Sequence, residues 1–146
     1  KMDIEGDEVE VLQGINKILS TSDKPIKILM EVHPMNFEAE AFTKELKRLF
    51  ALGFTTKYLV SAGKSRPPFF IERGYKPIKT YKTGDFTRGL YNNIDNEDVI
   101  EAASKLFDNQ VLYLPITQIL KNPSRIYNFK TVSTQKIVRS ILLERA

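Results

Sequence analysis

Apolar and polar positions along the first 60 residues predict strands and helices in turn. Residues 1–5 alternate between polar and apolar side chains and are followed by Gly6, which indicates a strand and then a tight turn. A short apolar run at 26–32, closed by Pro34, and another at 54–60 predict two further strands.

Two helices are predicted between these strands. The first begins near Asp7, and the second is capped by Asn36 and ends at Gly53. Their apolar faces repeat every 3.6 residues. The inward-facing residues are Val11, Leu12, Ile15, Ile18 and Leu19 in the first helix, and Phe42, Leu46, Leu49 and Phe50 in the second. The order β-α-β-α-β predicts an α/β sheet of parallel strands joined by helical crossovers.

The pattern changes after residue 60. Residues 61–93 have three prolines, four glycines and no helical period. Phe69–Glu72 and Tyr75–Tyr81 predict a small hairpin around Arg73-Gly74. A stretch of this length inside a compact domain is usually functional or mobile.

The rest of the chain predicts a helix capped by Asp95, a strand at 110–114, a short helical piece at 116–120 and a loop at 122–124. A last helix should follow, capped by Ser133. The inward-facing residues are Val99, Ala102, Ala103 and Leu106 in the helix after Asp95, and Ile137, Val138, Ile141 and Leu142 in the last helix.

Composition narrows the possible functions. The 146 residues are 42% hydrophobic and 27% charged, as expected for one globular domain or part of a larger one. The absence of cysteine excludes disulfides, thiolate metal sites and cysteine nucleophiles, and it fits a reducing cytosol. No apolar run is long enough to span a bilayer and no signal peptide opens the chain, so we expect a cytoplasmic protein without a membrane span.

Acidic side chains and the single histidine fall where two predicted strands end. Asp3 and Glu5 are two residues apart and point to the same side of the first strand, as Glu31 and His33 do on the second. Neighbouring strands would bring these four side chains into one crevice, where a general base or a metal site is expected. The competing interpretation is structural: acids before a glycine form turns, and a histidine beside proline can simply be a packed residue.

Residues 64–91 carry seven basic and two acidic side chains, with aromatic residues interleaved. Cations and aromatic rings together are typical of nucleic-acid binding. A solvated loop held by its aromatic residues, or a contact to an anionic substrate or a glycan, explains the same pattern. No DNA- or RNA-binding motif is present. The sequence also lacks a glycine-rich strand-to-helix loop and a phosphate-binding loop, which nucleotide cofactors require.

Four segments of the chain resemble a known family in the expected order. Residues 1–14, KMDIEGDEVEVLQG, resemble the signature strand, turn and helix of the FkbM-type methyltransferases. Residues 28–34 resemble the next strand of that family, which often ends Glu-x-His-Pro. Residues 52–54 resemble its Gly-aromatic entry to the following strand, and residues 109–115 its closing strand.

The resemblance implies a Rossmann-like class I methyltransferase that uses S-adenosylmethionine to methylate a hydroxyl of a sugar, glycan or other small molecule. Residues 1–115 would hold strands four to seven of that sheet, with 61–93 as an acceptor-binding insertion, and 116–146 would form a helical extension. The glycine-rich cofactor loop would lie upstream. We therefore expect the isolated chain to bind S-adenosylmethionine weakly or not at all and to be inactive.

The resemblance also implies roles for individual residues. Asp3 or His33 would take the hydroxyl proton, with Glu5 orienting the base, and Asp3 would also touch the cofactor. Glu31 would bind the acceptor. Asp3 and Glu5 could hold a divalent cation.

Two further expectations concern the acceptor and the sheet. The basic stretch offers Arg73 and Lys76 as additional acceptor contacts. Residues 1–5 and 26–32 should be parallel neighbours, and the strand at 110–114 should be antiparallel to its neighbours. The alternative function is a non-catalytic module that uses residues 64–91 to bind nucleic acid or another anionic partner.

Overall fold

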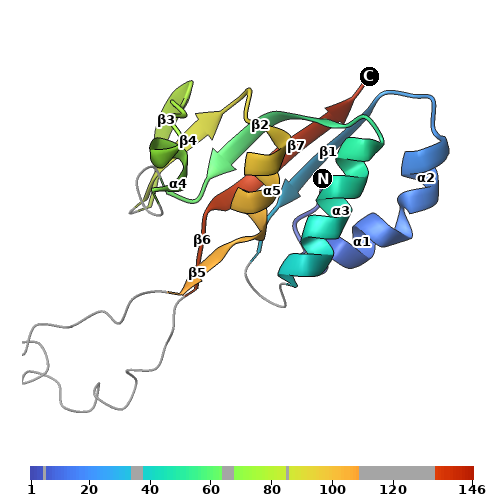
Figure 1. Ribbon diagram of the computed structural model, residues 1–146, viewed down its shortest axis with the longest axis horizontal. Helices are drawn as coiled ribbons and strands as arrows, with labels where there is room; N and C mark the ends of the chain where they lie inside the picture. Colours follow the sequence, from blue (N-terminus) through green and yellow to red (C-terminus); the bar gives the residue numbers. More distant parts are fainter. Residues whose placement is uncertain (5, 34–37, 64–67, 85, 109–133) are drawn as a thin grey trace, which may run out of the picture.

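The structure is a computed structural model that describes the chain except residues 5, 34–37, 64–67, 85 and 109–133. The first 108 residues contain both helices and strands, and two strands close the chain (Figure 1). The elements are α1 (Glu8–Gly14), α2 (Asn16–Thr21), β1 (Ile26–Glu31), α3 (Ala39–Ala51), β2 (Thr55–Ser61), α4 (Phe69–Glu72), β3 (Lys79–Thr83), β4 (Phe86–Tyr91), α5 (Asn96–Ser104), β5 (Leu106–Asp108), β6 (Thr134–Lys136) and β7 (Val138–Arg145).

Five strands form one sheet in the order β1-β7-β2-β4-β3, and β5 and β6 form a separate two-stranded sheet. The α/β class is therefore confirmed. Every strand pair in the large sheet is antiparallel, so the expected parallel pairing is wrong for these strands. The reason is β7, which lies between β1 and β2 and runs opposite to both (Figure 1). The two strands joined by α3 do run in the same direction, but they are not neighbours.

A parallel contact does occur at the start of the chain. Met2 forms a parallel bridge with Met30. Its amide donates to the carbonyl of Leu29 at 2.7 Å, and its carbonyl accepts from the amide of Glu31 at 3.0 Å. The prediction that the first residues lie parallel to 26–32 is confirmed at Met2, although the pairing covers this one residue.

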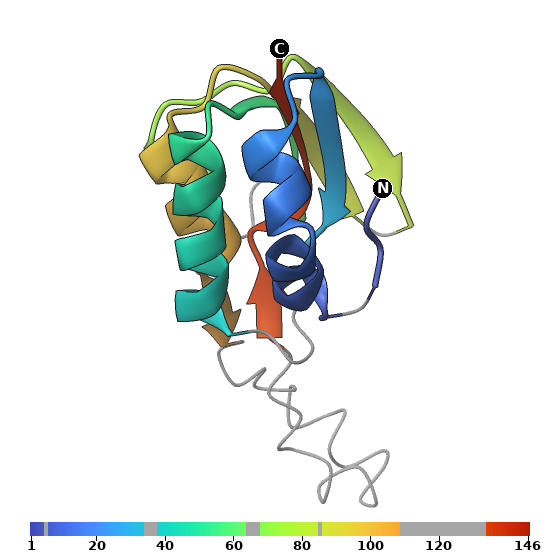
Figure 2. The same ribbon diagram turned by 90° about the vertical axis from the view of Figure 1, so that its right-hand side faces the viewer.

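The helices α1, α2, α3 and α5 lie on one side of the large sheet (Figure 2). Phe42, Leu46 and Leu49 of α3 are buried, as their spacing predicts. Gly53 ends this helix at a φ of +84°, which favours glycine. The predicted cap Asn36 lies outside the described residues. The helix predicted from Asp7 divides at Ile15 into α1 and α2.

Burial and capping in α1, α2 and α5 follow the prediction in part. Leu12 and Leu19 are buried as expected, whereas Ile18 is exposed. Asp95 precedes α5 as predicted, but its side chain makes no capping hydrogen bond. Leu106, placed in that helix from the sequence, begins β5 instead.

The predicted helix at the C-terminus is wrong. Residues 134–136 and 138–145 are strands, and β7 occupies the centre of the large sheet. Ile141 and Leu143 are fully buried, whereas Leu142, between them, is only partly so. This alternation is the pattern of a strand with two different faces. The segments predicted at 110–114, 116–120 and 122–124, and the cap Ser133, lie outside the described residues.

The hairpin predicted around Arg73-Gly74 is also misplaced. Phe69 and Phe70 belong to the short helix α4 and are buried. The hairpin is formed by β3 and β4, on either side of Gly84, which has a φ of +58°. Both phenylalanines pack into the core from α4 because helical neighbours can share a buried side, whereas successive strand residues alternate between two faces.

Gly89 in β4 is a test of this packing. A Cβ at Gly89 would lie 2.5 Å from the buried ring of Tyr91, which itself stacks on Phe70. We expect Gly89→Ala to lower the free energy of unfolding by about 1–3 kcal/mol, because the ring must leave its position. Denaturant titration measures this change. Gly14→Ala is the control, since its Cβ would meet nothing within 4 Å. Equal stability of the two variants would contradict the packing around Tyr91.

Candidate functional site at the end of strand β1

Three of the residues singled out in the sequence meet where β1 ends. Glu31 is the last residue of β1, and His33 follows two residues later. The bridge at Met2 brings Asp3 beside them. His33 Nε2 lies 3.5 Å from Asp3 Oδ1 and 4.0 Å from Glu31 Oε1. The structure thus brings Asp3, Glu31 and His33 together, while Glu5 lies outside the described residues.

Glu8, which was not among the candidate residues predicted from the sequence, completes this group. It lies in the first turn of α1, its side chain is 4% exposed, and its Oε1 lies 2.7 Å from His33 Nδ1. A carboxylate can only accept, so Nδ1 carries the proton of this hydrogen bond. In the neutral tautomer that has this proton, the unprotonated nitrogen is Nε2, which lies on the side of Asp3 and Glu31. The sequence feature that could have indicated this contact is the tight turn at Gly6, because it brings α1 back toward the end of β1.

Two positive groups also lie against Glu31. Arg139 Nη2 lies 2.7 Å from Glu31 Oε1, and Lys136 Nζ lies 3.9 Å from the same oxygen. Lys136 also donates to the carbonyl of Val32 at 2.6 Å. Burial lowers the pKa of the Lys136 ammonium. Neither cation was foreseen, because the sequence placed both in a C-terminal helix.

The fit of a divalent cation can be judged from these contacts. Asp3, Glu31 and His33 can each offer one ligand atom, all within 4.8 Å of one another. The hydrogen bond from His33 to Glu8 also resembles the outer contact of metal-binding histidines. Arg139 and Lys136, however, already lie against the Glu31 carboxylate, at Oε1. A cation would have to displace or repel two positive groups, so this arrangement does not fit a metal.

The structure does not bring Arg73 to this cluster. Arg73 Nε donates to Asp98 Oδ1 at 2.9 Å, its Nη2 donates to Glu101 Oε2 at 2.7 Å, and its guanidinium lies over the ring of Phe69. These contacts join the end of α4 to α5. Arg73, which was predicted to contact the acceptor, therefore has a structural role instead.

Lys76, the other predicted acceptor contact, is exposed. Among the described residues, the Lys76 side chain makes no contact with His33. Of the other basic residues of 64–91, Lys79 and Lys82 lie exposed on β3, and Arg88 is buried in β4. Lys64 and Arg66 lie outside the described residues.

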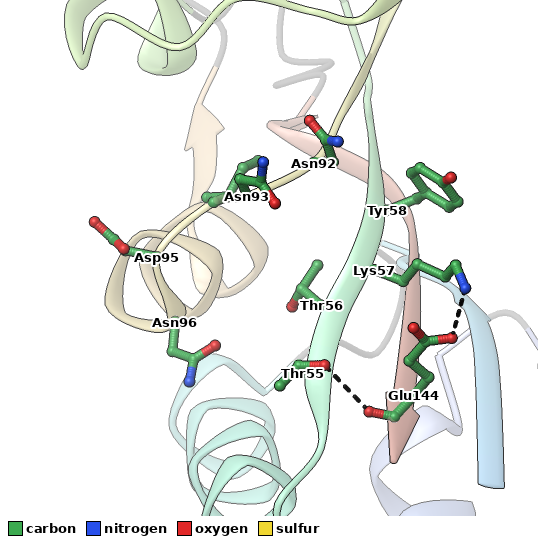
Figure 3. A pocket seen from close by; sticks show the side chains of 10 residues that line it. Thr55, Thr56, Lys57, Tyr58, Asn92, Asn93, Asp95, Asn96 and Glu144 are labelled. Atoms are coloured by element: carbon green, nitrogen blue, oxygen red, sulfur yellow. Dashed lines mark hydrogen bonds and ion pairs between the residues drawn. The ribbon is translucent and has the colours of Figure 1, made fainter. Parts of the chain in front are cut away.

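A separate polar hollow of about 550 Å³ lies beside the first residues of β2. Figure 3 shows Thr56 on the side of Asn93 and Asn96, with Lys57 reaching Glu144 at 2.9 Å. Thr55 pairs with Glu144 near the end of β7, whereas Glu31 pairs with Ser140 near its start. The hollow is therefore at the opposite end of the strands from His33. No histidine is among the described residues that line it.

Comparison of the chain with models of protein families, with curated proteins and with solved structures gives no match. Within the described part of the chain, no helix is both long and apolar enough to cross a membrane.

Proposed function

We propose that this chain forms part of an S-adenosylmethionine-dependent methyltransferase that methylates a hydroxyl of a sugar, glycan or other small molecule. The hydrogen bond between His33 and Glu8 carries the proposal, because it leaves Nε2 as a proton acceptor at a strand end. The resemblance of residues 1–14 to the FkbM-type enzymes supplies the reaction class. The chain arrangement also supports the proposal, because Met2 forms a parallel bridge with β1, as the crossover helix between these two segments predicts.

His33 acts as the general base in this proposal. S-adenosylmethionine, when bound, supplies an electrophilic methyl group, and the acceptor hydroxyl must lose its proton as its oxygen attacks. Nε2 accepts that proton, and the imidazolium so formed has Glu8 2.7 Å from Nδ1. A buried carboxylate there stabilises the positive ring more than it stabilises the neutral ring. This preference is what a general base requires.

Asp3 and Glu31 orient the acceptor and the base. Asp3 is partly exposed and close enough to Nε2 to accept a hydrogen bond from an acceptor hydroxyl that also reaches His33. Arg139 holds Glu31 in place through an ion pair at Oε1. Fixed polar groups on two chain segments would position the hydroxyl, and positioning is a large part of the catalysis of methyl transfer.

The second candidate function is binding of nucleic acid by the β3–β4 hairpin. The observation that favours it is exposure: Tyr81 and Phe86 present their rings to solvent beside Lys79 and Lys82. Exposed rings with adjacent cations can stack on bases and contact phosphates.

A methyl-transfer assay separates the two functions. The complete protein that contains this chain is incubated with isotopically labelled S-adenosylmethionine and a panel of sugars and small hydroxyl compounds, and labelled methyl ethers are detected. Methyl transfer that survives Tyr81→Ala supports the enzyme. Binding of single-stranded oligonucleotides that is lost in Tyr81→Ala, with no methyl transfer to any acceptor, would overturn it.

A further inference from the structure

Three cationic side chains lie at the end of the large sheet where β1 finishes, one from β4 and two from the consecutive strands β6 and β7. Arg88 belongs to β4, Lys136 to β6 and Arg139 to β7. The backbone places these positions at one end of the large sheet. The amide of Val32 donates to the carbonyl of Arg139, and the amide of Ala62, next to Arg88, donates to the carbonyl of Ile137.

Neutral oxygens, two from the backbone and one from a hydroxyl, hold two of these cations in place. Arg88 Nη1 donates to the carbonyl of Ala62 at 2.5 Å, and its Nε donates to Thr83 Oγ1 at 2.5 Å. Lys136 Nζ donates to the carbonyl of Val32 at 2.6 Å. Such contacts fix the position of a charge without neutralising it. The groups are therefore oriented in advance, which lowers the entropic cost of binding a ligand.

Charge around the three groups is unbalanced. Among the described residues, Glu31 is the one carboxylate in an ion pair with any of them, and it serves both Arg139 and Lys136. Burial lowers the pKa of Arg88, and the positive charge of Arg139 lowers it further. Burial and the charge of Arg139 also contribute to the lowered pKa of Lys136. The three cations thus repel one another in a partly desolvated place. The nearby acids Asp3 and Glu8 lie against His33 instead.

We propose that Arg88, Lys136 and Arg139 form a binding site for the anionic group, a carboxylate or a phosphate, of a ligand at this strand end. An anion would relieve the repulsion and accept hydrogen bonds from two guanidinium groups and an ammonium, which are the side chains that recognise such oxygens best. If His33 acts on the acceptor hydroxyl, the anion belongs to the acceptor, which is then a hydroxy acid or a phosphorylated hydroxyl compound. This last step rests on the proposed function, whereas the anion site does not.

Isothermal titration calorimetry of the protein with inorganic phosphate, and separately with acetate, tests the site at constant ionic strength. Arg139→Gln is the main variant, because the Arg139 side chain is 41% exposed and its replacement should not prevent folding. We expect its Kd for the preferred anion to rise at least about tenfold, since one charge-assisted hydrogen bond is lost. Lys136→Gln should have a similar effect. Arg139→Lys, which keeps the charge, should recover part of the affinity, and Lys79→Gln should bind as the wild type does.

The pattern of results decides the chemistry of the ligand. Dependence on Arg139 and Lys136 for phosphate alone assigns a phosphate, and dependence for acetate alone assigns a carboxylate. Binding of neither anion, or equal binding by wild type and both glutamine variants, would overturn the site. Because the titration contains no methyl donor, a failed methyl-transfer assay with intact anion binding would reject the reaction and leave the site standing.

Discussion

Replacing His33 with glutamine should lower the kcat of methyl transfer about 10²-fold or more in the complete protein, because the acceptor hydroxyl would lose its general base. Glutamine keeps a polar side chain of similar length that can still hydrogen bond to Glu8. The KM for S-adenosylmethionine should change less than kcat, since the main cofactor contacts are expected elsewhere. Steady-state kinetics with both substrates measures the two effects separately.

Glu8→Gln should act in the same direction through His33. The amide cannot stabilise a positive imidazolium as a carboxylate does, so kcat should fall while the KM for the acceptor stays close to the wild-type value. Asp3→Asn should lower kcat as well if Asp3 orients the hydroxyl beside Nε2. Lys82→Gln, on the exposed strand β3, is the matched control and should leave kcat unchanged.

The structural interpretation of His33 makes the opposite forecast. If the histidine only joins β1 to α1, its loss should lower the thermal midpoint while the folded fraction keeps its normal specific activity. Measuring kcat and the thermal midpoint on the same samples separates these outcomes. Normal turnover in both His33→Gln and Asp3→Asn would remove the two residues from the mechanism.

The sequence was most informative where a repeat of apolar residues matched a single element. Phe42, Leu46 and Leu49 recur at helical spacing, and Gly53 marks the end of their helix, so α3 was predicted nearly to its last residue. The juxtaposition of Asp3 with His33 also followed from the sequence. Two polar residues just beyond adjacent strands must lie close together, whatever the strands pack against.

Long-range pairing could not be predicted in the same way. Arg139 and Lys136 reach Glu31 because β7 enters the sheet between β1 and β2, and nothing local to either residue indicates that position. The hydrogen bond between Glu8 and His33 joins residues 25 positions apart and depends on the turn at Gly6 between Met2 and α1. Half of the candidate site therefore depends on topology rather than on local pattern.

The C-terminal segment shows why the periodicity was misleading. Ile137, Val138, Ile141 and Leu142 have the spacing of one helical face, but the same segment also has an alternating pattern in which Ile141 and Leu143 share a face. The two interpretations differ on Leu142. A helix would bury it beside Ile141, whereas a strand turns it to the opposite face of the sheet.

Truncation of these side chains tests the central place of β7 and should have the largest effect on stability. Ile141→Ala and Leu143→Ala should each lower the free energy of unfolding by about 2–5 kcal/mol, because both side chains are fully buried against the helical layer. Leu142→Ala should cost only about 1 kcal/mol, since part of its surface already contacts water. Denaturant titrations of the three variants give the comparison directly. A cost for Leu142→Ala equal to that of Ile141→Ala, with little effect of Leu143→Ala, would indicate a helical face and place residues 138–145 outside the sheet. That result would also separate Arg139 from Glu31 and remove the structural basis of the anion site.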